Sequence, residues 1–122
     1  MPQLTRPTRS TSRQASLRHA WRGLGVFLSQ PNARIQGVAA VLAGLLGAWL
    51  GVSRFEWMVL LLTVALVLAA EALNTALEYA VDLASPEWHP LARDAKDVAA
   101  AAVLICSLCA AVVGLLVFVP YF

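Results

Sequence analysis

The sequence predicts an all-α integral membrane protein, with an N-terminal amphipathic helix at the membrane interface and three transmembrane helices. Hydrophobic residues make up 60% of the 122 residues, and the mean hydropathy is +0.72. Soluble domains contain only roughly 45–50% apolar residues. Long uncharged stretches also alternate with short polar segments, which is the pattern that spans and their connecting loops produce. We therefore expect residues 12–122 to form one membrane domain.

The region before the first span divides into two parts. Residues 1–11 are rich in Pro, Arg, Ser and Thr, and such a segment buries too little apolar surface to order itself, so we expect a mobile basic tail. Residues of about 12–29 show a helical period with arginines between the apolar positions, which favours an interfacial helix. Docking of this helix onto the other helices is the alternative. The apolar positions are Leu17, Trp21, Leu24 and Leu28.

Basic residues before the first span predict the orientation. No acid accompanies them, so the positive-inside rule places the N-terminus in the cytoplasm. Three crossings of a cytoplasmic (inner) membrane then put the C-terminus outside. Arginines here also suit anionic lipid headgroups, and we expect no nucleic-acid partner. These arginines are Arg6, Arg9, Arg13, Arg18, Arg22 and Arg34.

The three spans are expected at about 34–53, 55–82 and 92–119. The first carries no charge between Ile35 and Ser53. The second begins with the apolar run 57–70, which is too short to cross a bilayer alone and must continue towards Asp82. A loop with two prolines follows, and from Val98 onward the chain carries no charge again. The third span therefore runs back antiparallel to the second.

A polar stripe runs along the second span. At 100° per residue, Glu71, Asn74, Glu78 and Asp82 fall within a sector of about 80° on one helix face. Ionisable groups at membrane depth cost several kcal/mol, so they usually face a bundle interior and serve a function. A solvated helix end is the alternative interpretation. That alternative fits Asp82, but Glu71 lies too deep for it.

Lys96 and Asp97 should approach this stripe, because a short loop joins the two antiparallel spans. Lys96 could neutralise Glu78 or Asp97, or it could bind a ligand. The acids outnumber the cations, and an all-oxygen ligand set of this kind suits Mg²⁺. Phosphate chemistry is therefore plausible. The sequence has neither a G-x-x-x-x-G-K-[ST] loop nor a G-x-G-x-x-G turn, so any nucleotide site is unconventional.

The residues of this region resemble the prokaryotic diacylglycerol kinase and undecaprenol kinase family. The resemblance covers residues 17–120 and rests on the pattern E-x-x-N-x-x-x-E-x-x-x-D with a downstream A-K-D, at residues 71–82 and 95–97. It implies a homotrimer whose active sites are shared between subunits. It also implies ATP-dependent phosphorylation of a membrane lipid hydroxyl, with diacylglycerol converted to phosphatidic acid and undecaprenol as the alternative acceptor.

The resemblance also implies roles for individual residues. Glu71 matches the general base, Asn74 its polar partner, and Glu78 the carboxylate that holds Mg²⁺ with ATP. Gln30 stands where the family often has a second metal-binding glutamate, so weaker metal affinity is expected, although an amide oxygen can still ligate Mg²⁺. Nucleotide contacts are expected from Glu78, Asp82, Glu87, Trp88, His89, Lys96 and Asp97. Apart from the resemblance, we expect lipid contacts from Glu71, Asn32, Arg34 and Trp57.

Two other classes of function compete with a lipid kinase. A small proton-coupled transporter could exchange protons at Glu71 for a cationic substrate, but it leaves Lys96 and Asp97 unexplained. A non-enzymatic membrane scaffold predicts that no acid of the stripe is needed. Radiolabelled ATP incubated with membranes and lipid separates the three hypotheses, because only a kinase produces a labelled lipid.

Overall fold

α-Helices make up nearly all of residues 12–122, which are the residues that this computed structural model describes. The chain order is α1 (Arg13–Leu28), α2 (Pro31–Leu50), α3 (Arg54–Ala84), α4 (Pro90–Phe118) and a short 3₁₀-helix, η1 (Val119–Tyr121). The described part contains no strand. The all-α prediction is confirmed, and the predicted tail over 1–11 lies outside the described residues.

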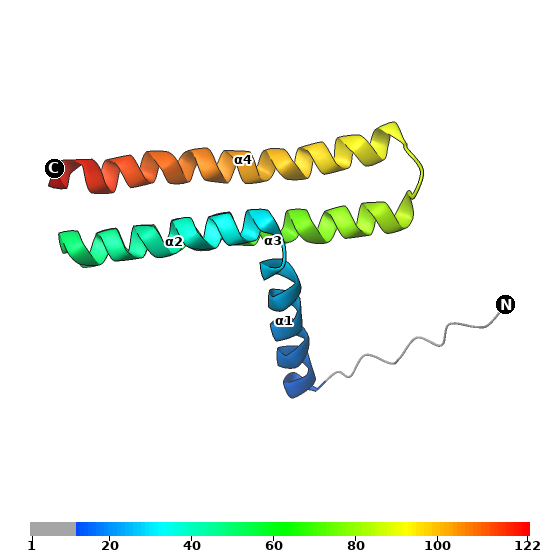
Figure 1. The fold of residues 1–122 in the computed structure, drawn as a ribbon, viewed down its shortest axis with the longest axis horizontal. Helices are drawn as coiled ribbons and strands as arrows, with labels where there is room; N and C mark the ends of the chain where they lie inside the picture. Colours follow the sequence, from blue (N-terminus) through cyan, green and yellow to red (C-terminus); the bar gives the residue numbers. More distant parts are fainter. Residues whose placement is uncertain (1–11) are drawn as a thin grey trace.

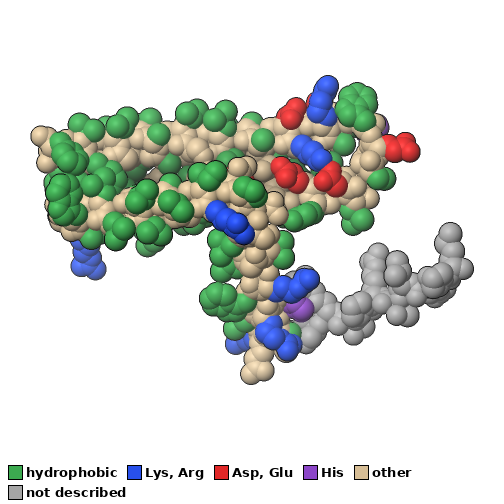
Figure 2. Space-filling view, in the orientation of Figure 1, with side chains coloured by type: hydrophobic (Ala, Val, Ile, Leu, Met, Phe, Trp, Pro, Cys, Tyr) green, Lys and Arg blue, Asp and Glu red, His purple; other side chains and the backbone are tan. Residues whose placement is uncertain are grey.

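The three long helices α2, α3 and α4 lie side by side, and α3 runs antiparallel to the other two (Figure 1). Each is long and apolar enough to cross a membrane. Hydrophobic side chains cover the bundle along its length, whereas acids gather near the α3–α4 loop (Figure 2). A surface of this kind needs lipid around it. The chain is a membrane protein with three candidate spans, as the sequence predicted.

Prolines set two helix boundaries earlier than the predicted ranges. The first span was expected from about 34 and the third from about 92, yet α2 begins at Pro31 and α4 at Pro90. A proline at the first helical position loses nothing, because its missing N–H has no partner there in any helix. Pro31 and Pro90 therefore start helices instead of preceding them.

α1 runs roughly perpendicular to the bundle (Figure 1). Leu17 and Trp21 on this helix are exposed, so α1 does not dock along the other helices within the single chain. If α2–α4 cross the membrane, α1 lies parallel to its surface, as expected of an interfacial helix. The corner is held by Arg34, whose Nε donates to the Leu28 carbonyl at 3.0 Å.

The length of α3 sets the depth of the polar stripe. The helix has 31 residues, about 46 Å of rise, which exceeds a hydrocarbon core of roughly 30 Å. Glu71 lies about 26 Å along the axis from Arg54, near the far boundary of that core. Glu78 and Asp82 lie further on, where α3 leaves the hydrocarbon region. The acids thus mark the end of the bundle that carries the α3–α4 loop.

Candidate active site

The α1–α2 corner and the second half of α3, towards the α3–α4 loop, line a polar pocket of about 150 Å³. Gln30, the residue before α2, and the first turn of α2 form one wall, and successive turns of α3 form the other. We call this cavity the Glu71 pocket. Its lining residues are Gln30, Pro31, Asn32, Glu71, Asn74, Thr75 and Glu78. The helical spacing of the α3 members explains why one face supplies them all.

Glu71 is the most deeply buried ionisable residue of this pocket, with only 3% of its surface exposed. The Asn32 side chain, from α2, lines the same pocket as the Glu71 carboxylate. On the other side, the Thr75 hydroxyl donates to the Glu71 main-chain carbonyl at 3.0 Å. No cation among residues 12–122 pairs with Glu71, and a buried ionisable group of this kind is a candidate for a functional role.

Asn74 and Glu78 form a second polar layer one turn further along α3. The Asn74 Nδ2 donates to Glu78 Oε1 at 3.4 Å. The Asn74 Oδ1 is buried and has no partner among the described residues. Opposite them, the Gln30 Nε2 donates to the Tyr79 hydroxyl at 2.8 Å. An unpaired buried oxygen costs roughly 1–3 kcal/mol, which indicates that a ligand completes this layer.

The charges of this pocket suit a divalent cation. Glu71 and Glu78 repel each other electrostatically, and none of the described residues that line the pocket is basic. Within residues 12–122, no three acidic, histidine or cysteine side chains gather closely enough to hold a metal by themselves. Mg²⁺ commonly binds through one or two carboxylates together with substrate phosphates. The carboxylate and amide oxygens present fit that requirement.

A second cavity, of about 300 Å³, lies at the α3–α4 loop. We call it the loop pocket. Lys96 lines it and donates to the Asp82 carboxylate across the two helices. The sequence suggested Glu78 or Asp97 as the partner of Lys96, but the ion pair forms with Asp82 instead. The other polar lining residues are Ser85, Glu87, Trp88, His89 and Arg93.

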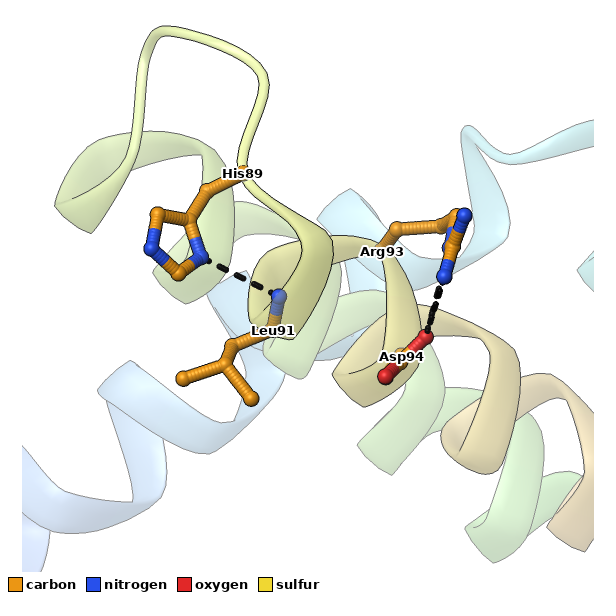
Figure 3. Close-up of polar contacts among 4 residues, drawn as sticks. All are labelled: His89, Leu91, Arg93 and Asp94. Atoms are coloured by element: carbon orange, nitrogen blue, oxygen red, sulfur yellow. Dashed lines mark hydrogen bonds and ion pairs between the residues drawn. The ribbon is translucent and has the colours of Figure 1, made fainter.

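Local contacts hold the wall of the loop pocket (Figure 3). The His89 Nδ1 accepts from the Leu91 N–H at 3.1 Å and caps α4. A neutral His89 therefore carries its proton on Nε2. Arg93 donates through Nε and Nη2 to Asp94 at 3.2 and 3.1 Å, and its guanidinium lies 5.9 Å from the Trp88 ring centroid. The sequence analysis did not predict Arg93 as a lining residue of this pocket. A cation five residues after Trp88 could have indicated a cation–π contact.

Residues 18–118 match the family model described as prokaryotic diacylglycerol kinase. The chain belongs to the prokaryotic diacylglycerol kinase family. It is 37% identical to the undecaprenol kinase of Bacillus subtilis over 84% of each chain. It is also 37% identical to the diacylglycerol kinase of Escherichia coli K12, over 77% of this chain and 78% of that one.

A third relative is the diacylglycerol kinase of Synechocystis, which is 43% identical over 86% of this chain and 61% of that one. Membership of the prokaryotic diacylglycerol kinase family makes the chain a lipid kinase, as the sequence predicted. The comparisons give no support to the transporter hypothesis.

The structure brings most of the expected site residues of this family member to one end of the bundle, but not all. Arg34 ties α1 to α2 and does not line the Glu71 pocket. Asp97 is exposed and lines neither cavity described above. Trp57 lies about 21 Å from Glu71 along α3. Its ring packs so closely on α2 that a Cβ at Gly47 would lie 2.9 Å from it.

Proposed function

We propose that this kinase transfers the γ-phosphate of ATP to the hydroxyl of a membrane lipid at the Glu71 pocket, with diacylglycerol as the acceptor. The observation that carries the proposal is the burial of Glu71 at the boundary of the hydrocarbon core. A lipid hydroxyl lies at this depth, because its tails remain in the bilayer while its polar end meets water. Glu71 is therefore placed to meet the reacting oxygen.

Glu71 acts as the general base in this proposal. Its carboxylate accepts the proton of the lipid hydroxyl while that oxygen bonds to the γ-phosphorus and the bond from phosphorus to the β-bridging oxygen breaks. The products are a phosphorylated lipid and ADP. Asn32 holds the Glu71 carboxylate in place, and Asn74 orients Glu78 through its amide. Arg34 stands nearest the lipid headgroup, and Trp57, about 21 Å from Glu71 along α3, contacts the lipid tail.

Nucleotide binding is assigned to the residues around the loop pocket. Lys96, held by Asp82, offsets phosphate charge, and the Trp88 ring and His89 Nε2 contact the nucleoside. Glu87 and Asp97 complete the expected nucleotide contacts. Mg²⁺ would be held by Glu78 with Gln30 and Asn74, and it would neutralise charge on the phosphate oxygens. Positioning and charge neutralisation supply most of the rate enhancement in phosphoryl transfer.

The proposed assembly is a homotrimer in the inner membrane, with the N-terminus in the cytoplasm and the C-terminus outside. Two features support it. Glu78 is exposed in the single chain although its neighbours Asn74 and Thr75 are buried, so a neighbouring subunit can complete the site. The basic residues of α1 also suit a cytoplasmic, anionic surface.

The test offers both lipids side by side. Purified protein in mixed micelles receives γ-labelled ATP with either diacylglycerol or undecaprenol, and thin-layer chromatography detects labelled lipid. We expect label in phosphatidic acid, with much less in undecaprenyl phosphate. Undecaprenol is the second candidate because the Bacillus relative bears that name at 37% identity. Label in neither lipid would contradict the proposal, and a preference for undecaprenol would replace the acceptor.

A further inference from the structure

Two amide side chains of the Glu71 pocket, those of Gln30 and Asn74, each donate a hydrogen bond to another side chain through the amide nitrogen. The Gln30 nitrogen donates to the Tyr79 hydroxyl at 2.8 Å, and the Asn74 nitrogen donates to Glu78 at 3.4 Å. Each amide thus uses one of its two N–H bonds on the protein, which leaves its carbonyl oxygen available to a ligand. The Asn74 oxygen is buried and unpartnered within the described part of the chain.

The pocket consequently presents mostly acceptors. Glu71 and Glu78 contribute carboxylate oxygens, and Gln30 and Asn74 contribute amide oxygens. The donors are the Thr75 hydroxyl, which the Glu71 carbonyl already uses at 3.0 Å, and the Asn32 amide on the Glu71 side of the pocket. Oxygen acceptors that face one another repel unless a cation or a donor lies between them. Two carboxylates balance a divalent cation, and neutral amide oxygens complete its ligands without surplus charge.

Tyr79 holds the nitrogen end of the Gln30 amide, because the Gln30 Nε2 donates to its hydroxyl. It lies on α3 next to Glu78, is 53% exposed and does not line the pocket itself. Without its hydroxyl, the Gln30 amide is free to rotate and turn its N–H₂ group towards the carboxylates, which attract donors. Such a rotation would place a donor where a cation needs an oxygen.

We infer that Tyr79 is a positioning residue of the cation site: its hydroxyl fixes the Gln30 amide so that the carbonyl oxygen joins Glu78 and Asn74 as a neutral ligand for a divalent cation. This inference rests on the proposed function, because that function places the cation at Glu78. It explains how a glutamine serves at a position where a charged ligand was expected. Removal of the Tyr79 hydroxyl should therefore weaken cation binding, and the Kd for the cation measures this effect.

The test measures cation binding directly. Full-length protein in lipid nanodiscs is titrated with Mn²⁺ in the presence of a non-hydrolysable ATP analogue, and electron paramagnetic resonance reports free Mn²⁺. Tyr79→Phe should raise the Kd for Mn²⁺ by about fivefold, the equivalent of one net hydrogen bond. Gln30→Ala should raise it at least as much. The double variant should bind no more weakly than Gln30→Ala, because Tyr79 acts through Gln30.

A matched control is available at the other end of the bundle. Tyr121→Phe removes the same single hydroxyl from a tyrosine that contacts Glu56, and it should leave the Kd for Mn²⁺ unchanged. Glu78→Ala should abolish specific Mn²⁺ binding. Far-UV circular dichroism checks that every variant is folded.

The outcomes separate the inference from the proposed function. If Glu78→Ala loses Mn²⁺ while Tyr79→Phe binds like the wild type, the role of Tyr79 is overturned and the cation site stands. Additive losses in the double variant would overturn the action of Tyr79 through Gln30. Unchanged Mn²⁺ binding in Glu78→Ala would overturn both this inference and the cation assignment of the proposed function.

Discussion

The two ends of α3 each carry a glutamate and a nearby tyrosine, but their hydrogen bonding differs. At the start of α3, Glu56 accepts from the Ser53 N–H at 3.0 Å, and the Ser53 hydroxyl accepts from the Glu56 N–H at 3.1 Å. The Tyr121 hydroxyl donates to the same Glu56 carboxylate. This reciprocal capping box satisfies two helix-terminal donors at once. The Glu56 end is therefore complete with the protein's own groups.

At the Glu71 end, by contrast, the protein does not supply a partner for every buried polar group. Glu71 is buried beside Glu78 without a cation, and the Asn74 oxygen has no partner among the described residues. Side-chain type is thus a poor guide to role, because both ends contain glutamate in the same helix. A buried acceptor without a hydrogen-bond partner indicates a ligand-binding site, whereas fully hydrogen-bonded groups indicate a structural contact. The predictions below use this contrast.

Glu71→Gln should have the largest effect. The amide keeps the shape of the side chain but cannot accept the lipid proton, so kcat should fall by about 10²–10⁴-fold, the usual range for loss of a general base. Binding of ATP should persist, because the proposed nucleotide contacts lie around the loop pocket. Labelled-lipid formation measures the first quantity, and equilibrium binding of a fluorescent ATP analogue measures the second.

Glu56→Gln is the matched control, because it makes the same substitution at the satisfied end of the helix. It should retain kcat within about twofold and lower stability only slightly, because a glutamine can still accept from the Ser53 N–H. Equal losses of kcat in the two variants would show that helix integrity, and not proton acceptance, limits turnover.

Lys96→Met should have the next largest effect. The ion pair with Asp82 is partly exposed, so its loss costs little stability, but phosphate charge would then lack its cation. We expect kcat/KM for ATP to fall by about tenfold or more, and the KM for lipid to change little. Arg54→Met removes a cation from the opposite end of α3 and should leave both constants unchanged. A larger effect on the lipid KM than on the ATP KM would argue against a nucleotide role for Lys96.

Gln30→Glu should strengthen cation binding. A third carboxylate at the pocket adds Coulomb attraction, which at 4 Å and an effective dielectric of 20 reaches about 4 kcal/mol before repulsion from Glu71 and Glu78 is subtracted. We expect the Kd for Mn²⁺ to fall by on the order of tenfold. Gln14→Glu, on the exposed face of α1, adds the same charge away from the site and serves as the control. A Kd that does not fall would place Gln30 outside the cation's reach.

The sequence predicted the features that depend on one helix. The stripe from Glu71 to Asp82 follows from the helical period alone, and the three spans follow from runs of apolar residues. Pairings between helices were harder. Lys96 meets Asp82 instead of Glu78 or Asp97, because the partner depends on how far α4 is shifted along α3, which a local pattern does not specify.

Contacts between distant segments were not predicted at all. The Gln30–Tyr79 and Tyr121–Glu56 hydrogen bonds join residues 49 and 65 positions apart, and neither pair belongs to a periodic pattern. The position of Trp57 relative to the lipid headgroup was also not predictable from the sequence. An aromatic residue near a span end suits an interface, yet the sequence alone does not say which of the two interfaces the lipid headgroup occupies.

Tyr121→Phe should have the smallest effect. The hydroxyl contributes one hydrogen bond to a partly exposed carboxylate, which adds little to stability. The contact between Trp49 and Phe122, with ring centroids 6.4 Å apart, still holds the C-terminus. Unfolding in mixed micelles of increasing SDS fraction should show this small loss of stability, whereas kcat and the Kd for Mn²⁺ stay at wild-type values. A loss of activity from so small a change would mean that the two ends of α3 are coupled, because a satisfied contact at one end would then govern the open pocket at the other.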